Sequence, residues 1–259
     1  MATLQKIFTP LEIVGDGVKR SLILFHVAIL VLAWTFLVPD KTLFPSLGEV
    51  LVAWKDLWMK GLFFHILKTL QLCGTATLIS IIVSCIVAYA STIPFFTPIS
   101  LFFTKLRYNP IQGFTLFLTI MSGGGRNLQI TLLVVFMSFY FITSLISVIN
   151  DIPPEDFIRR KTQKMGNWKI LWKVVILDRK DYLVEVIRVN LGIVLMMIVS
   201  VEAMDKNQGG LGSLLVDTGR GLNFPKIFAL QLNILLIGIG LDMLLQLIFN
   251  SFPAQKKHR

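Results

Sequence analysis

The chain has 259 residues, of which 54% are hydrophobic, and a mean hydropathy of +0.73. A composition this apolar excludes an ordinary soluble domain and is typical of a protein with several membrane spans. The formal net charge is +10, which we assign to basic cytoplasmic loops near anionic lipid headgroups rather than to nucleic-acid binding. Cys73 and Cys85 lie about 18 Å apart along one predicted helix, so they cannot pair with each other.

Six apolar stretches predict membrane spans. They cover about residues 21–38, 69–90, 110–122, 128–149, 183–204 and 227–249. The third is shorter than the roughly 20 residues that a helix needs to cross a bilayer, and prolines interrupt the segment in front of it. Six spans place both termini in the cytoplasm, with residues 1–20 and 252–259 as tails and no cleavable signal peptide. The sequence therefore predicts an all-α membrane protein with one transmembrane domain, residues 21–251.

A short amphipathic helix is predicted between the first two spans, lying in the outer interface of the membrane. Ser46 is its expected N-cap, and Glu49 completes a capping box three residues later. Its predicted apolar face comprises Val50, Leu51, Trp54, Leu57 and Trp58. The second span contains small residues that favour close helix packing, namely Gly74, Ala76, Ser80, Ser84 and Ala88.

The most distinctive stretch is basic and polar, residues 150–182, and the positive-inside rule places it in the cytoplasm. Pro154 is expected to open a helix, with Glu155 and Asp156 in the first turn, where the helix dipole favours negative charge. Gly166 is expected to end this helix in the left-handed conformation. The sequence therefore predicts about three turns of helix that stop at a glycine.

A second amphipathic helix is predicted directly after that glycine, with Asn167 as its cap. Its expected apolar face comprises Trp168, Leu171, Trp172, Val175 and Ile176. The first helix carries apolar residues that have no span to join, Phe157, Ile158 and Met165, which suits an anchor in a groove on a partner. We therefore expect a compact helical hairpin rather than a slack connection.

We single out three ionisable side chains inside predicted spans, where a charge needs a partner or water. Arg188 and Asp242 are expected at similar depth, which predicts a structural ion pair between the fifth and sixth spans. Glu202 is expected near the outer mouth. It could cap the Gly-rich segment that follows or face a binding protein, and the sequence leaves both interpretations open.

Motifs for catalysis and metal binding are missing from the sequence. It contains no Walker A pattern, H-E-x-x-H, G-x-S-x-G or metal-spaced Cys/His cluster. We therefore do not expect an enzyme, a bound cofactor or a metal site, and any ATP would be hydrolysed by a partner subunit.

Several stretches resemble the permease subunits of ABC importers of the nitrate/sulfonate/taurine class. The resemblance covers about residues 44–251 and is carried by FPSLGEVLVAW, LRYNP, IPPEDFIRRKTQKMG, IRVNLGIVLMMIVSVEAM, GGLGSLL and IGIGLDMLL. It implies a type I importer permease fold in the cell inner membrane and a path for a small polar or anionic solute. It also implies an ABC ATPase subunit, an extracytoplasmic substrate-binding protein and a second permease subunit, in a homodimer or heterodimer.

In this family the cytoplasmic loop carries a Glu-Ala-Ala-x-x-x-Gly signature that docks into the ATPase. Gly166 keeps its place in this chain, but Arg160, Lys161 and Thr162 stand where Glu-Ala-Ala would be. Prolines that the family commonly has after the glycine are replaced by Leu177 and Asp181. The docking residues that we carry over are Glu155, Phe157, Ile158, Arg159, Arg160, Lys161, Lys164, Met165, Gly166 and Asn167.

Two other classes of protein remain open. A secondary transporter would carry its own coupling-ion site in two related halves, and the sequence shows no such internal repeat. A non-transporting membrane scaffold is favoured slightly by the altered loop signature.

Overall fold

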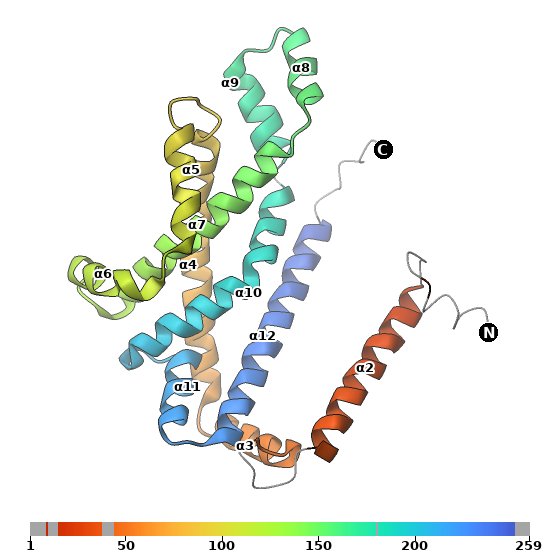
Figure 1. The fold of residues 1–259 in the computed structure, drawn as a ribbon, viewed down its shortest axis with the longest axis vertical. Helices are drawn as coiled ribbons and strands as arrows, with labels where there is room; N and C mark the ends of the chain where they lie inside the picture. Colours follow the sequence, from red (N-terminus) through yellow and green to blue (C-terminus); the bar gives the residue numbers. More distant parts are fainter. Residues whose placement is uncertain (1–8, 10–14, 38–43, 180, 252–259) are drawn as a thin grey trace.

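The computed structural model describes residue 9 and residues 15–37, 44–179 and 181–251. Over these ranges the chain is all-α, with 11 α-helices joined by short turns (Figure 1). They are α2 (Asp16–Leu37), α3 (Leu47–Met59), α4 (Leu62–Ala90), α5 (Thr97–Lys105), α6 (Thr115–Ser122), α7 (Gly125–Asn150), α8 (Pro154–Thr162), α9 (Asn167–Ile170), α10 (Asp181–Met204), α11 (Leu211–Arg220) and α12 (Phe224–Ser251). The predicted C-terminal tail and most of the N-terminal tail lie outside the described residues.

Five of these helices are long and apolar enough to cross a membrane: α2, α4, α7, α10 and α12. By this composition the chain is a multi-pass membrane protein. The five helices correspond to five of the six predicted spans.

The third predicted span, residues 110–122, is not one long helix. Within it α6 has 8 residues, which extend about 12 Å and cover less than half of a bilayer core. Pro110 separates α5 from α6 because it has no backbone N–H to donate. Asn109, the residue before it, adopts the extended conformation that proline imposes, with φ −77° and ψ 136°.

The core lies where α4 packs along α7, with α10 against both. Small residues allow the close approach of α4 and α7, as the sequence predicted, although Gly74 is exposed. The Ser84 hydroxyl donates to the carbonyl oxygen of Ser138 at 3.2 Å, and the Ser138 hydroxyl donates to that of Ser80 at 3.5 Å. These contacts fix the register between the two helices.

Helix α3 begins with the predicted capping box of Ser46 and Glu49. Its buried face is shifted from the predicted one: Val50, Ala53 and Leu57 are buried, whereas Leu51 and Trp58 are 50% and 46% exposed. The face turns toward α12, on which α3 packs.

Two lysines reinforce the contact between α3 and α12. The Asp56 carboxylate accepts from Lys226 of α12 at 2.7 Å and pairs with Lys60 at 3.1 Å. Hydrogen bonds from Lys226 and then Lys60 hold the pKa of Asp56 below its ordinary value of 3.8.

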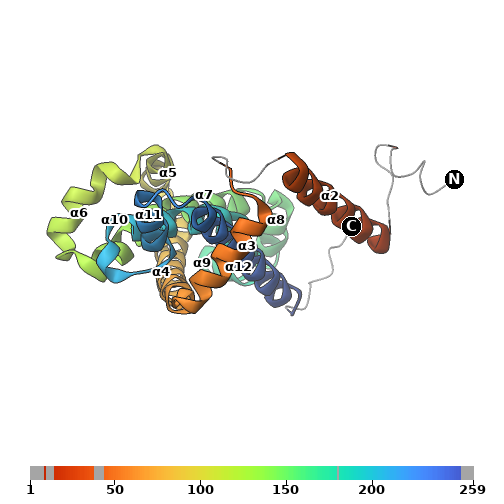
Figure 2. The same cartoon turned by 90° about the horizontal axis from the view of Figure 1, so that it is seen from below.

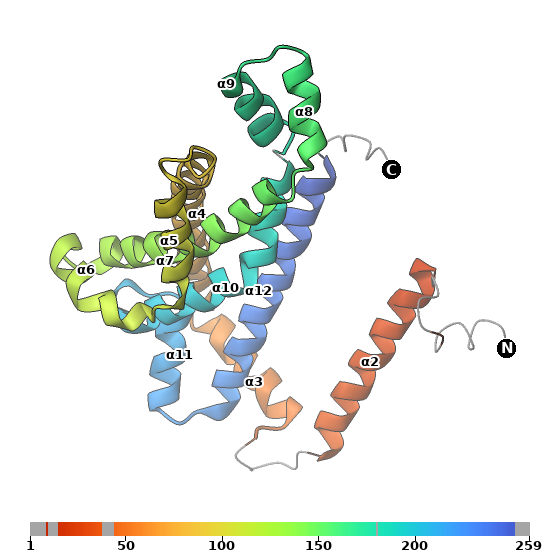
Figure 3. The same cartoon turned by 45° about the horizontal axis from the view of Figure 1, so that its top comes forward.

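Helix α2 stands apart from the bundle (Figures 1 and 3). Seen from below, α2 and α6 lie at opposite sides of the molecule (Figure 2). Contact is made near the end of α2, where the Trp34 indole donates to the Pro45 carbonyl at 3.0 Å and its ring lies 6.1 Å from that of Phe228. Upstream side chains such as Leu24 are exposed, as lipid-facing residues of a span are.

Candidate functional site

The predicted cytoplasmic segment folds as a helical hairpin between α7 and α10. It consists of α8, α9 and the π-helix η3 (Leu171–Leu177), and we call it the basic hairpin. It projects beyond the rest of the bundle at the end where α7 finishes and α10 starts (Figure 1). Short connections join the hairpin to both α7 and α10, so it directly links these two helices in the chain.

The basic hairpin has a small core of its own, formed by Ile152, Ile170, Val174 and Val175. Phe157 and Met165 pack against this core. Two of the three apolar residues expected to anchor a partner are therefore used inside the hairpin. The third, Ile158, is 59% exposed and remains available for a partner.

The predicted apolar face of the second helix is correct only in part: Val175 is buried and Leu171 packs against the same core, but the two tryptophans do not. Trp168 and Trp172 are 73% and 59% exposed, whereas Ile170 and Val174 are buried. The physical reason is that α9 ends after 4 residues and the backbone continues as a π-helix, whose wider turn breaks the 3.6-residue spacing behind the prediction.

The predicted role of Gly166 as the left-handed stop of the first helix is also wrong. Lys164 occupies that position, with φ 56°. The Met165 amide donates to the Arg160 carbonyl at 3.3 Å and the Lys164 amide donates to that of Lys161 at 2.9 Å, which is the hydrogen-bond pattern of a Schellman motif. The first helix therefore ends at Thr162, shorter than predicted.

Gly166 instead precedes α9 as its N-cap, in extended conformation with φ −66° and ψ 152°. Asn167 is then the first residue of α9 and not its cap. A Cβ atom added at Gly166 would meet nothing within 4 Å. The structure thus gives no steric reason for a glycine at this position.

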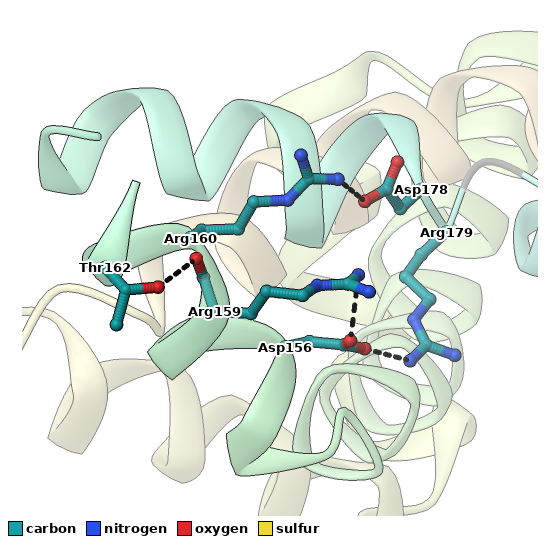
Figure 4. A network of polar contacts seen from close by, with 6 residues as sticks. All are labelled: Asp156, Arg159, Arg160, Thr162, Asp178 and Arg179. Atoms are coloured by element: carbon teal, nitrogen blue, oxygen red, sulfur yellow. Dashed lines mark hydrogen bonds and ion pairs between the residues drawn. The ribbon is translucent and has the colours of Figure 1, made fainter. Parts of the chain in front are cut away.

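Ion pairs hold the two arms of the basic hairpin together (Figure 4). Asp156 of α8 pairs with Arg159 at 3.4 Å and with Arg179 at 3.9 Å. Arg160 pairs with Asp178 at 3.4 Å, across the two arms of the hairpin. Arg160, which stands where the resembled family has a glutamate, is therefore engaged inside the hairpin.

The other predicted docking residues lie mainly on the surface of the hairpin. Those exposed are Glu155, Ile158, Arg159, Lys161, Lys164, Gly166 and Asn167, whereas Phe157, Arg160 and Met165 are half-buried. A groove of 440 Å³ separates the hairpin from the corner between α4 and α5, with Lys161 and Trp168 on one side and Ile93 and Pro94 on the other.

The ion pair predicted between the fifth and sixth spans is present. The Arg188 guanidinium of α10 donates to the Asp242 carboxylate of α12 at 2.7 Å. Glu185 lies on the same face of α10 and is 3.6 Å from Arg188. Sequence reasoning missed Glu185, although its spacing of three residues from Arg188 signals a neighbour on a helix.

Glu202 is completely buried near the C-terminal end of α10, the end that the sequence predicts to be the outer one. Its carboxylate accepts from the Thr69 hydroxyl at 2.8 Å and from the Gly212 amide at 3.0 Å. The Thr69 hydroxyl in turn accepts from the Leu211 amide at 2.9 Å. Of the two roles left open by the sequence, Glu202 thus has the first: it caps the N-terminus of α11.

Two glycines make this capping possible. A Cβ atom at Gly210, where φ is +117°, would lie 2.2 Å from the Glu202 carboxyl carbon. A Cβ atom at Gly212 would lie 2.0 Å from the carbonyl oxygen of Val199. We call Thr69, Glu202, Gly210 and Gly212 the outer clasp; it joins α4, α10 and α11.

Comparison with known proteins adds no assignment to this geometry: no protein-family model and no curated protein matches the chain. Among the described residues no group of His, Cys, Asp and Glu is arranged to hold a metal ion. The basic hairpin and the charges within the spans are therefore the features that bear on function.

Proposed function

We propose that this chain is the permease subunit of an ATP-driven importer of the ABC class, in which a separate ATPase drives the passage of a small polar solute. The basic hairpin carries the proposal. An ion pair joins its two arms, it has a small hydrophobic core, and it lies between two candidate spans. A loop that only fixed membrane topology would need basic residues but no such internal order.

The surface of the hairpin suits a protein partner. Ile158, Trp168 and Trp172 expose apolar side chains, and Lys161 and Lys164 are exposed beside them in the chain. Exposed aliphatic and aromatic residues of this kind act as anchors in a partner's groove. The basic residues would set the orientation and the rate of association more than the affinity.

The remaining parts of the proposal follow from the span count. Together with the five long helices, the segment from α5 to α6 would complete a sixth, broken crossing, which would put both termini and the basic hairpin in the cytoplasm. Six spans are few for a closed path, and the family resemblance implies a dimer, so the chain would work as a pair with two ATPase subunits and an extracytoplasmic binding protein. Labelling of Lys164→Cys from the cytoplasmic side alone would support this orientation, and labelling from the outside would reject it.

The decisive experiment measures ATPase binding and solute-stimulated ATP hydrolysis in the reconstituted complex. Ile158→Asp should weaken ATPase binding about thirtyfold, because an interface anchor contributes about 2 kcal/mol. Val52→Asp, at a side chain that is 71% exposed on α3, is the matched control and should bind normally. Unchanged binding by Ile158→Asp would contradict docking at the hairpin, and failure of any ATPase to co-purify would favour a scaffold.

A further inference from the structure

A pocket lies between α7 and α10 at the end of the bundle nearest the basic hairpin, and we call it the α7–α10 pocket. Most of its lining surface is apolar, with a few hydroxyls and one carboxylate. Its cavity volume is 230 Å³. Residues that line it include Ser144, Ser147, Val148, Tyr182, Glu185 and Val189. Glu185 is four residues after the start of α10, which is about 6 Å along the helix, so the pocket belongs to the cytoplasmic part of the two spans.

Several hydroxyl groups of the pocket are free to bind a solute. Ser144 accepts a hydrogen bond from Asn190 at 2.9 Å, which orients it. Within the described ranges, the hydroxyls of Ser147 and Tyr182 have no hydrogen-bond partner. The Tyr182 ring is held by the Arg179 guanidinium, 5.3 Å from its centre. The pocket therefore presents positioned hydroxyls with unused hydrogen-bonding capacity.

Glu185 is the charged residue among those that line the pocket. Glu185 and Asp242 are two carboxylates that share one guanidinium, that of Arg188, whereas Arg179 beside Tyr182 pairs with Asp156 at 3.9 Å. Arg188 is 2.7 Å from Asp242 but 3.6 Å from Glu185, so the guanidinium neutralises the Asp242 carboxylate more than that of Glu185. The Glu185 side chain is 38% exposed and is the less neutralised carboxylate.

Charged groups within a span favour water or a partner over lipid. A charged side chain in the hydrocarbon region costs at least ~2.5 kcal/mol, and such residues line water-filled cavities or meet partners. The uncovered face continues along α10 at successive turns, through Val189, Gly192 and Met196, all of which are exposed. The α7–α10 pocket therefore opens on the same side as a continuous uncovered face of α10.

We propose that the α7–α10 pocket is a binding subsite on the cytoplasmic part of the solute path, and that it takes the positively charged group of a small organic cation. The Glu185 carboxylate provides the opposite charge, and the hydroxyls of Ser147 and Tyr182 complete the coordination. A cavity of 230 Å³ is smaller than a typical ligand pocket, so it fits an ammonium-sized group. The inference rests on the proposed function and replaces the anionic solute that the family resemblance implies.

Charged thiol reagents test this subsite without any ATPase. In full-length protein with Cys73→Ala and Cys85→Ala, Ser147→Cys is labelled in membranes with a cationic trimethylammonium or an anionic sulfonate methanethiosulfonate. The cationic reagent should react faster. Glu185→Gln should lower the ratio of cationic to anionic rates about tenfold, the effect of one charge in partly aqueous surroundings. Glu185→Asp should keep the ratio.

Ser200→Cys in the same background is the matched control. Ser200 is on the same uncovered side of α10, about 22 Å from Glu185 along the helix, which is beyond the screening length at physiological salt. Glu185→Gln should leave its labelling unchanged, which also shows that the variant is folded. If Glu185→Gln does not fold, the test is the ratio of cationic to anionic labelling rates at Ser147→Cys in the protein that keeps Glu185.

Protection supplies the binding measurement. Tetramethylammonium chloride should slow cationic labelling of Ser147→Cys, whereas sodium chloride at equal ionic strength should not. Failure of both reagents to label Ser147→Cys would mean that a partner covers the pocket and would overturn the inference. Equal rates for the two reagents, or protection by sodium chloride alone, would also overturn it. Because these assays need no ATPase, their failure is distinguishable from failure of the proposed function.

Discussion

The outer clasp makes a sharp prediction for Gly212→Ala. The added Cβ atom would lie 2.0 Å from the Val199 carbonyl oxygen and 2.8 Å from the Glu202 Cβ atom, whereas ordinary contacts between heavy atoms are about 3.5 Å. Both neighbours belong to α10, so α11 would have to move away from it by roughly 1 Å or more. That movement would break the bond of 3.0 Å between the Gly212 amide and Glu202.

The magnitude follows from two effects. Overpacking of a tight contact costs about 1–3 kcal/mol. Breaking this hydrogen bond leaves a buried acceptor less satisfied, at a cost of about 1–3 kcal/mol. Together the two effects predict that Gly212→Ala is destabilised by about 2–6 kcal/mol. At about 2–4 °C per kcal/mol for a chain of this size, the apparent melting temperature should fall by about 4 °C or more.

The assay is thermal unfolding of the purified protein in detergent, followed by circular dichroism. Gly192→Ala is the matched control, because a Cβ atom there meets nothing within 4 Å and the position is inside the same α10. It should gain up to about 1 kcal/mol from the higher helix propensity of alanine. The reasoning would be refuted if Gly212→Ala melted at the same temperature as the wild type. It would also be refuted if Gly192→Ala lowered the melting temperature as much as Gly212→Ala does.

Three further predictions concern the hairpin and the ion pairs. Lys164→Gly should stabilise the basic hairpin by about 1 kcal/mol, because glycine adopts the left-handed conformation without the cost of a Cβ atom; slower amide exchange in α8 would show it, and faster exchange would contradict it. Asp242→Asn leaves Arg188 poorly compensated and should lower folded yield, whereas unchanged yield in both Asp242→Asn and Arg188→Gln would show that the pair is dispensable. Because pairing with Lys226 lowers the pKa of Asp56, the ion pair should stabilise the folded protein above about pH 4, and this stabilisation should be lost as the pH falls through the folded pKa. The melting temperature of Asp56→Asn should therefore lack the drop at acid pH that the wild type shows. Identical pH profiles for the two proteins would contradict this role of Asp56.

The membrane spans could be predicted from the sequence because length and apolarity are a direct physical requirement for crossing a bilayer. Five predicted spans match long helices, and the exception follows from a proline that the sequence also displays, Pro110. The capping box of Ser46 and Glu49 was predictable for the same reason, since it depends on residues close in the chain.

Other parts of the candidate site depend on contacts that no local pattern specifies. Thr69 and Glu202 are 133 residues apart in the chain, so only the packed bundle brings them together. Within the hairpin, the residue with left-handed backbone is Lys164 and not the predicted Gly166, because the Schellman hydrogen bonds outweigh the preference for glycine. The burial of Val174 instead of Trp172 depends on a π-helical backbone that helical periodicity does not predict.

The serine contacts between α4 and α7 have a mechanical consequence. The hydroxyls of Ser84 and Ser138 each reach a backbone carbonyl of the opposite helix. A slide of one residue, about 1.5 Å, would break these contacts and leave each hydroxyl only the acceptor in its own helix, the carbonyl of Ser80 or of Val134 at 2.6 Å. Interhelical hydrogen bonds of this kind contribute about 0.6 kcal/mol each in membranes, and several act along the same seam. We expect α4 and α7 to serve as the fixed frame against which any shape change in the other helices takes place.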